Sequence, residues 1–145
     1  MCYKFISNES KNITIINFYN KGNYIYDNFE NDKEIINILE NKDDMLVLAG
    51  DFNKGYGIDD KEEYIKFVEK YKKYELIDCV NNYSEKYIPT SYYTKTKKYY
   101  LNDFCFVKNC NGRILNENDE WENHNDNMLW KGLSDHRALI IEINI

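Results

Sequence analysis

Three short segments of this sequence carry polar residues that could do chemistry, each at the end of a predicted buried strand. The segments are Gly50–Asn53, Asn102–Val107 and Ser134–His136. Open α/β sheets place their active sites at the ends of strands, where backbone direction changes and side chains converge. The three segments therefore predict one site built from residues that are distant in the chain.

The residue types in these segments fit the hydrolysis of a phosphodiester. They supply Asp51, Asn53, Asp103, Asp135 and His136. A histidine that moves protons needs a carboxylate to fix its tautomer and stabilise its charged form. A divalent cation needs hard oxygen ligands, and the transition state needs donors and cations on its phosphate oxygens. Taken singly, each acid could equally be a turn former or a helix cap.

Four stretches of the chain resemble motifs of the endonuclease/exonuclease/phosphatase superfamily. Leu48–Asn53 resembles its Gly-Asp-Phe-Asn motif, and Leu101–Val107 resembles its Arg-Ile-Asp-Tyr-Ile strand. Ser134–Leu139 resembles its terminal Ser-Asp-His-Xaa-Pro-Leu motif, and Ile15–Tyr19 resembles the Val-Xaa-Asn-Xaa-Tyr strand of its nuclease branches. The similarity runs from about Ile13 to the end of the chain, in the family's order, which makes it far more specific than one motif alone.

The resemblance implies catalytic roles for four residues. His136 would be the general base, or the acid–base partner of the phosphate, and Asp103 would orient it. Asp51 would align the attacking water near the metal, and Asn53 would hold a phosphate oxygen and help to place Asp51. The implied reaction is in-line attack of water on phosphorus.

The resemblance also implies a metal site and a phosphate site. Asp51 and Asn53 would lie at a Mg²⁺ or Mn²⁺ ion, and Asp135 would contribute to a second metal position. Asn17 and Tyr19 would face the substrate phosphate. We therefore expect a metal-dependent phosphodiester hydrolase, most similar to the abasic-site and retrotransposon endonucleases, with nucleic acid as its substrate. A phosphoinositide or sphingolipid phosphodiesterase, or an inactive or split-domain remnant, is the alternative.

Several positions depart from the family's pattern. Leu101 stands where arginine is usual, Asn20-Lys21 replaces a proline, and Ala138 replaces another. The family's first half, which carries an Asn strand and a Glu metal ligand, has no counterpart here, and Glu9 lacks the matching context. We expect residues 1–145 to form a single partial domain, a layered α/β part of a four-layer α-β-β-α sandwich with a mixed sheet. A separate chain could supply the missing half.

Composition limits the other partners of the chain. The net charge is −6, so nucleic acid would be held by a local site and by metal ions rather than by a general basic field. Lys95, Lys97 and Lys98, interleaved with tyrosines, indicate either an exposed hairpin or a phosphate contact. His124 lies in a polar run and is expected to be solvated. With no long apolar run and no leader sequence, we expect no membrane contact and a cytoplasmic or nuclear location.

Hydrophobic patterning predicts the elements that position the site. Apolar β-branched runs predict buried strands, and spacing of three and four residues predicts two amphipathic helices. A polar stretch from Lys108 to Lys131 is expected to hold a short hairpin and an irregular loop. The predicted strands are 13–19, 45–50, 76–78, 90–94, 101–107 and 138–145, and the predicted helices are 31–41 and about 60–74.

Overall fold

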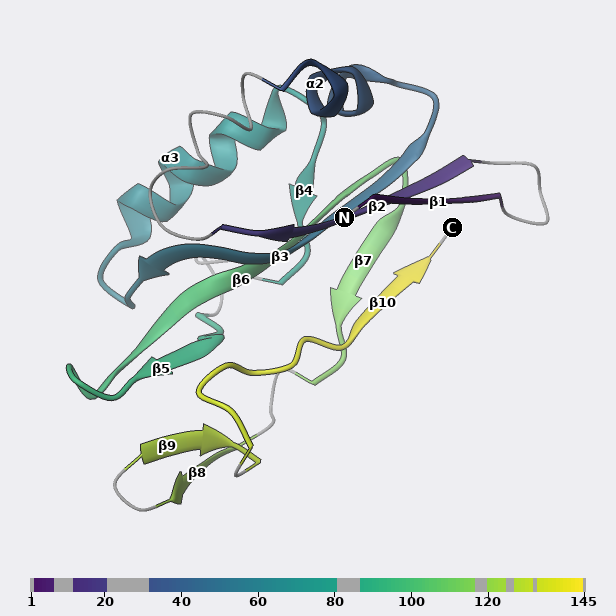
Figure 1. Ribbon diagram of the computed structural model, residues 1–145. Helices are drawn as coiled ribbons and strands as arrows, with labels where there is room; N and C mark the ends of the chain where they lie inside the picture. The colour runs from purple at the N-terminus through teal and green to yellow at the C-terminus, as the bar shows by residue number, and fades with distance from the viewer. Residues whose placement is uncertain are drawn as a thin grey trace.

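A six-stranded mixed sheet forms the centre of the molecule (Figure 1). The computed structural model describes residues 2–6, 12–20, 32–80, 87–116, 120–124, 127–131 and 133–144. The strand order is β1-β2-β3-β6-β4, with β5 paired to β6 as well. Only the β2–β3 pair is parallel among these described pairs. The strands are β1 (Cys2–Ile6), β2 (Asn12–Tyr19), β3 (Met45–Tyr56), β4 (Ile77–Asp78), β5 (Ser91–Tyr93) and β6 (Lys98–Lys108).

Two helices cover one face of this sheet (Figure 1). Helix α2 (Lys33–Glu40) begins at Asp32, whose carboxylate accepts hydrogen bonds from the first free backbone N–H groups. Helix α3 (Lys61–Lys72) buries Tyr64, Phe67 and Tyr71, which recur at the spacing of one helix face. Neither described helix has the length and apolar character needed to cross a membrane.

Phe52 lies at the centre of the core between the helices and the sheet. Its side chain is 0% exposed. The ring centroids of Phe18, Phe67, Phe104 and Phe106 lie 4.7 to 5.9 Å from its own, mostly in edge-to-face arrangements. Aromatic pairs prefer such geometry because the ring edge is positive and the face negative. Phe52 thereby anchors the turn between Asp51 and Asn53 to the core.

A two-stranded ribbon packs against the opposite face of the sheet (Figure 1). Its strands are β7 (Asn111–Ile114) and β10 (Ile141–Asn144), and a second hairpin joins β8 (Trp121–His124) to β9 (Asn127–Trp130). Val47, Cys105 and Val107 of the sheet lie under the ribbon's isoleucines. The described part of the chain is thus layered as helices, sheet and ribbon.

The sequence predicted the mixed α/β class correctly, but some element bounds differ. Strands β1 and β7 were not predicted, and β3 runs six residues past Gly50. The last strand starts at Ile141 instead of Ala138. There the Asn116 side chain bonds the carbonyl of Ala138 and the N–H of Ile140, so these groups are used outside a strand ladder. The four-layer sandwich stays a prediction.

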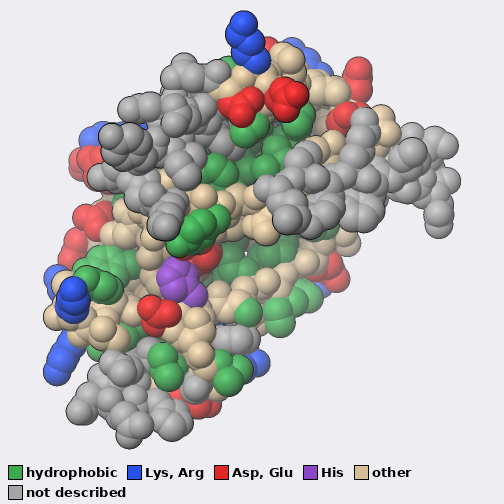
Figure 2. Space-filling model, viewed as in Figure 1, with side chains coloured by type: hydrophobic (Ala, Val, Ile, Leu, Met, Phe, Trp, Pro, Cys, Tyr) green, Lys and Arg blue, Asp and Glu red, His purple; other side chains and the backbone are tan. Residues whose placement is uncertain are grey.

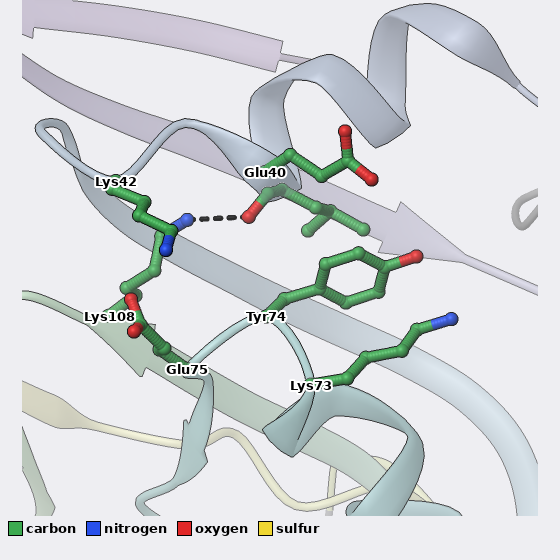
Figure 3. A pocket seen from close by; sticks show the side chains of 7 residues that line it. Glu40, Lys42, Lys73, Tyr74, Glu75 and Lys108 are labelled. Atoms are coloured by element: carbon green, nitrogen blue, oxygen red, sulfur yellow. Dashed lines mark hydrogen bonds between the residues drawn. The ribbon is translucent and has the colours of Figure 1, made fainter.

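Lys108, at the end of β6, caps α2 from a distant part of the chain (Figure 3). Lys108 is 2% exposed, and its ammonium donates hydrogen bonds to the carbonyls of Leu39 and Asn41, at 2.6 Å each. A cation at a helix C-terminus is favourable because carbonyls point outwards there. A cavity of about 470 Å³ adjoins it, with Lys42 and Glu75 on its wall. Because the Lys108 ammonium already bonds two carbonyls at the end of α2, this cavity is not our candidate site.

Candidate functional site

Three neighbouring strands bring two predicted site acids together. Tyr19 of β2 pairs with Asp51 of β3, and Asp51 pairs in turn with Asp103 of β6. Side chains alternate between the two faces of a strand. Because Phe104 and Phe106 pack towards the helices, Asp103 lies on the face that carries the ribbon. In Figure 2, a histidine side chain lies beside acidic side chains.

Strand β3 departs from regular pairing directly after Asp51. The pairing with β6 resumes only at Tyr56, which is opposite Leu101. Residues 52–55 of β3 therefore face a single residue of β6, and we call this segment the β3 bulge. Asn53 and Gly55 have positive φ angles of 49° and 65°. Bulges bend a strand and aim side chains in new directions.

The Asp51 carboxylate is fixed by Asn53. Its Oδ1 accepts the backbone N–H of Asn53 at 2.8 Å, and its Oδ2 accepts the Asn53 side-chain amide at 3.1 Å. The same amide also bonds the carbonyl of Asn20. Asn53 therefore helps to hold the Asp51 carboxylate in place.

Asn20 secures the same turn from β2. It is 2% exposed, its N–H donates to the Asp51 carbonyl at 2.8 Å, and its side chain donates to the Phe52 carbonyl at 3.1 Å. Sequence reasoning noted Asn20 only as a departure from proline. A polar residue directly after an apolar strand was the available signal, but its bonds depend on β3 lying alongside.

His136 reaches the acids from the segment that precedes β10. Its Nδ1 lies 3.0 Å from Oδ2 of Asp103, as the sequence-based role for Asp103 requires. A carboxylate at Nδ1 favours the tautomer with the proton there, which leaves Nε2 for proton transfer. Ser134 fixes the turn by accepting the His136 backbone N–H at 3.0 Å.

Local charges shift the pKa values of two of these groups. The hydrogen bond that His136 donates to Asp103, with the charges of Asp103, Asp51 and Asp135, raises the pKa of His136 despite its partial burial. Burial is the main cause of the raised pKa of Asp51, and the charge of Asp103 adds to it, although bonds from Asn53 oppose the shift. Burial and the neighbouring Asp103 carboxylate therefore both disfavour the charged form of Asp51.

The His136–Asp103 pair predicts a pH dependence of stability. Because the folded-state pKa of His136 is raised above 6.5, its contribution is fully present below pH 6.5 and is lost as the pH rises through the raised value. Urea unfolding of the wild type and His136→Gln between pH 5.5 and 8.5 measures this. We expect the wild type to lose more unfolding free energy over that range. Parallel curves would contradict the coupling.

The donor set at Asp51 fits a hard divalent cation. Asp51, Asp103 and His136 each offer a ligand atom, and these atoms lie within 4.8 Å of one another. Oxygen donors with excess negative charge suit Mg²⁺ or Mn²⁺. Of these three residues, Asp51 is the one that the sequence predicted as a metal ligand. Asn53 and Asp135, the other predicted ligands, stay predictions.

A cavity of about 330 Å³ opens beside His136. Its wall includes Asn53 and Asp135 together with residues that the sequence did not assign to the site: Gly55, Ser91, Tyr92, Tyr93, Tyr100 and Asn102. Asp135 is exposed there. The tyrosines belong to the β5–β6 hairpin, whose turn carries Lys95 and Lys97, so the predicted exposed hairpin is present.

Of the remaining predicted residues, Tyr19 lies next to Asp51, and Asn17 lines another cavity. Tyr19 is 64% exposed next to Asp51 in the sheet. Asn17 lines a separate cavity of about 430 Å³, together with Asp103. Glu9 and the side chain of His124 lie outside the described residues. The structure therefore groups Asp51, Asn53, Asp103, Asp135 and His136, with Tyr19 at the edge.

The comparisons with known proteins identify no family for the chain. No protein-family model matches it, and no curated protein matches its sequence. The assignment of function therefore depends on the motifs and on the geometry of the site.

Proposed function

We propose that this chain is a metal-dependent phosphodiester hydrolase, and that it acts on nucleic acid as an endonuclease. The observation that carries the proposal is the contact of His136 with Asp103, with Asp51 beside both. An imidazole held by a carboxylate can take a proton from water, and acidic oxygens can hold the ion. These groups come from three motifs that resemble one superfamily.

The residues would divide the reaction between them. Nε2 of His136 would take the proton of the attacking water, and Asp103 would stabilise the imidazolium that results. Asp51 and Asn53 would hold Mg²⁺ or Mn²⁺, which supplies charge stabilisation for the phosphate when bound. The exposed Tyr93 and the hairpin lysines would contact the substrate beyond the scissile phosphate.

The proposal is tested by incubating a supercoiled plasmid and an abasic-site oligonucleotide with the chain. We expect nicking with Mg²⁺ or Mn²⁺, and none after EDTA removes the ion, because the proposed reaction needs the ion to stabilise charge on the phosphate. Inositol phosphates and sphingomyelin serve as comparison substrates. Absence of cleavage by folded protein with either ion would contradict the proposal.

The second candidate is that a partner chain completes the enzyme. The cavity under the ribbon is lined by apolar residues, including Ile15, Ala49, Leu139 and Ile141. Leu115 and Ile140, near the ribbon, are also about half exposed. Such surfaces favour a further packed layer. Repeating the cleavage assay with the family's first half supplied in trans distinguishes a partner-dependent enzyme from one that acts alone.

A further inference from the structure

Asn102 lies where the two parts of the site meet. It precedes Asp103 in β6 and is the single residue opposite the β3 bulge. Its Oδ1 accepts the backbone N–H of Gly55 at 2.6 Å, and its Nδ2 donates to Oγ of Ser91 at 2.7 Å. One side-chain amide thus joins β3, β5 and β6.

The Gly55 contact restrains the segment that carries Asp51 and Asn53. Between Asp51 and Tyr56 the pairing of β3 with β6 is interrupted. The Asn102 side chain lies at this interruption and accepts a hydrogen bond from the Gly55 N–H. A bond of this kind limits how far the bulge can move from β6, and therefore how far Asp51 can move from Asp103.

The Ser91 contact restrains the segment that carries His136. Ser91 forms an isolated antiparallel bridge with His136, and the next residue, Tyr92, donates its N–H to the carbonyl of Asp135 at 2.8 Å. The Ser91 hydroxyl also donates to the carbonyl of Tyr100 at 3.3 Å. The position of Ser91 thus sets the position of the Asp135–His136 turn.

We propose that Asn102 is a positioning residue that holds the Asp51–Asn53 segment and the His136 segment at a fixed separation. The inference rests on the proposed function, because it concerns the geometry of the same site. Asn102 lines the cavity beside His136, yet its oxygen and its amide each already have a protein partner. Its proposed role is carried by these two contacts with the neighbouring strands.

The test compares three variants of the full chain in Mn²⁺ binding and in steady-state cleavage. Asn102→Leu removes both contacts, whereas Ser91→Ala removes the contact of Asn102 with β5 and the Ser91–Tyr100 bond but keeps the Gly55 contact. Asn41→Leu is the matched control: the Asn41 amide also joins a backbone N–H, that of Asp43, to a side-chain oxygen, that of Asp44. Asn41 follows α2 and lies at the Lys108 end of the sheet. Mn²⁺ binding is measured by calorimetry without substrate.

We expect Asn102→Leu to weaken Mn²⁺ binding and to lower kcat, each by about 10- to 100-fold, as the loss of a residue that orients metal ligands does. Ser91→Ala should lower kcat with little change in Mn²⁺ affinity, since the Gly55 contact persists. Asn41→Leu should change neither quantity. This separation of effects is one that a general loss of stability would not produce.

Four outcomes would overturn the inference. If the wild type binds Mn²⁺ and cleaves, and folded Asn102→Leu does the same, the inference fails while the proposed function stands. If Asn41→Leu loses as much as Asn102→Leu, the effect is general and the inference also fails. If the wild type neither binds Mn²⁺ nor cleaves, the proposed function fails and the inference with it. Should Asn102→Leu not fold, an unchanged kcat in Ser91→Ala overturns the inference and a lowered kcat supports it.

Discussion

Replacing His136 by alanine is expected to reduce metal-dependent cleavage by about 10²- to 10⁴-fold, the usual contribution of a positioned general base. The reason is that Asp103 holds Nδ1 of His136 at 3.0 Å, which leaves Nε2 as the proton acceptor. The measurement is the rate of plasmid nicking at saturating Mg²⁺, with folding checked by circular dichroism.

The matched control is the other histidine of the chain. His124→Ala makes the same substitution at a position that the sequence assigns to solvent. It should cleave at the wild-type rate. The His136→Asn variant adds a second check, because asparagine can still bond Asp103 but cannot take a proton. Cleavage by either His136 variant at the wild-type rate would show that another group is the base.

Gly50→Ala is expected to destabilise the fold by on the order of 3–5 kcal/mol, or to prevent folding. Gly50 has a φ of 143°, and a Cβ added there would lie 1.8 Å from the carbonyl oxygen of Phe18, which is backbone of the neighbouring strand. Since Phe18 pairs with Gly50 in the sheet, the two strands would have to separate. Urea unfolding measures the loss.

Gly55→Ala is the control for this prediction. Gly55 also has a positive φ, 65°, but a Cβ there would have only the Asn102 Oδ1 near it, at 4.0 Å. It should cost only the conformational strain, about 1–3 kcal/mol. If the two variants lose equal stability, the close approach of Phe18 to Gly50 does not limit the fold.

Hydrophobic periodicity located the central elements of the fold. The β-branched runs that ended at Tyr19 and Gly50 became β2 and part of β3, and Tyr64, Phe67 and Tyr71 face the core from α3 as their spacing indicated. These segments contain enough apolar residues for the hydrophobic pattern to predict which side chains are buried. Strand β7 contains Asn111 and Arg113 and is buried on one side only, so its pattern was too weak to predict it.

The main site residues could be predicted because each stands next to a distinctive strand. Asp51 comes directly after one apolar run, and Asp103 comes directly before another. The structure places the two acids opposite each other, with His136 bonded to Asp103. Asn20 and Asn102 could not be predicted in the same way. Their hydrogen bonds are made to Phe52 and Gly55, residues far away in the chain, and no local pattern encodes such partners.

Strand β6 also governs when the site can form during folding. It pairs with β3, β4 and β5, and it carries Asp103, which bonds a histidine 33 residues further along the chain. Contacts between residues that are distant in sequence are made slowly, because loop-closure entropy must be overcome first. Because Phe52 packs against Phe104 and Phe106 of the same strand, the aromatic core and the site both depend on the long-range pairing of β6 with β3.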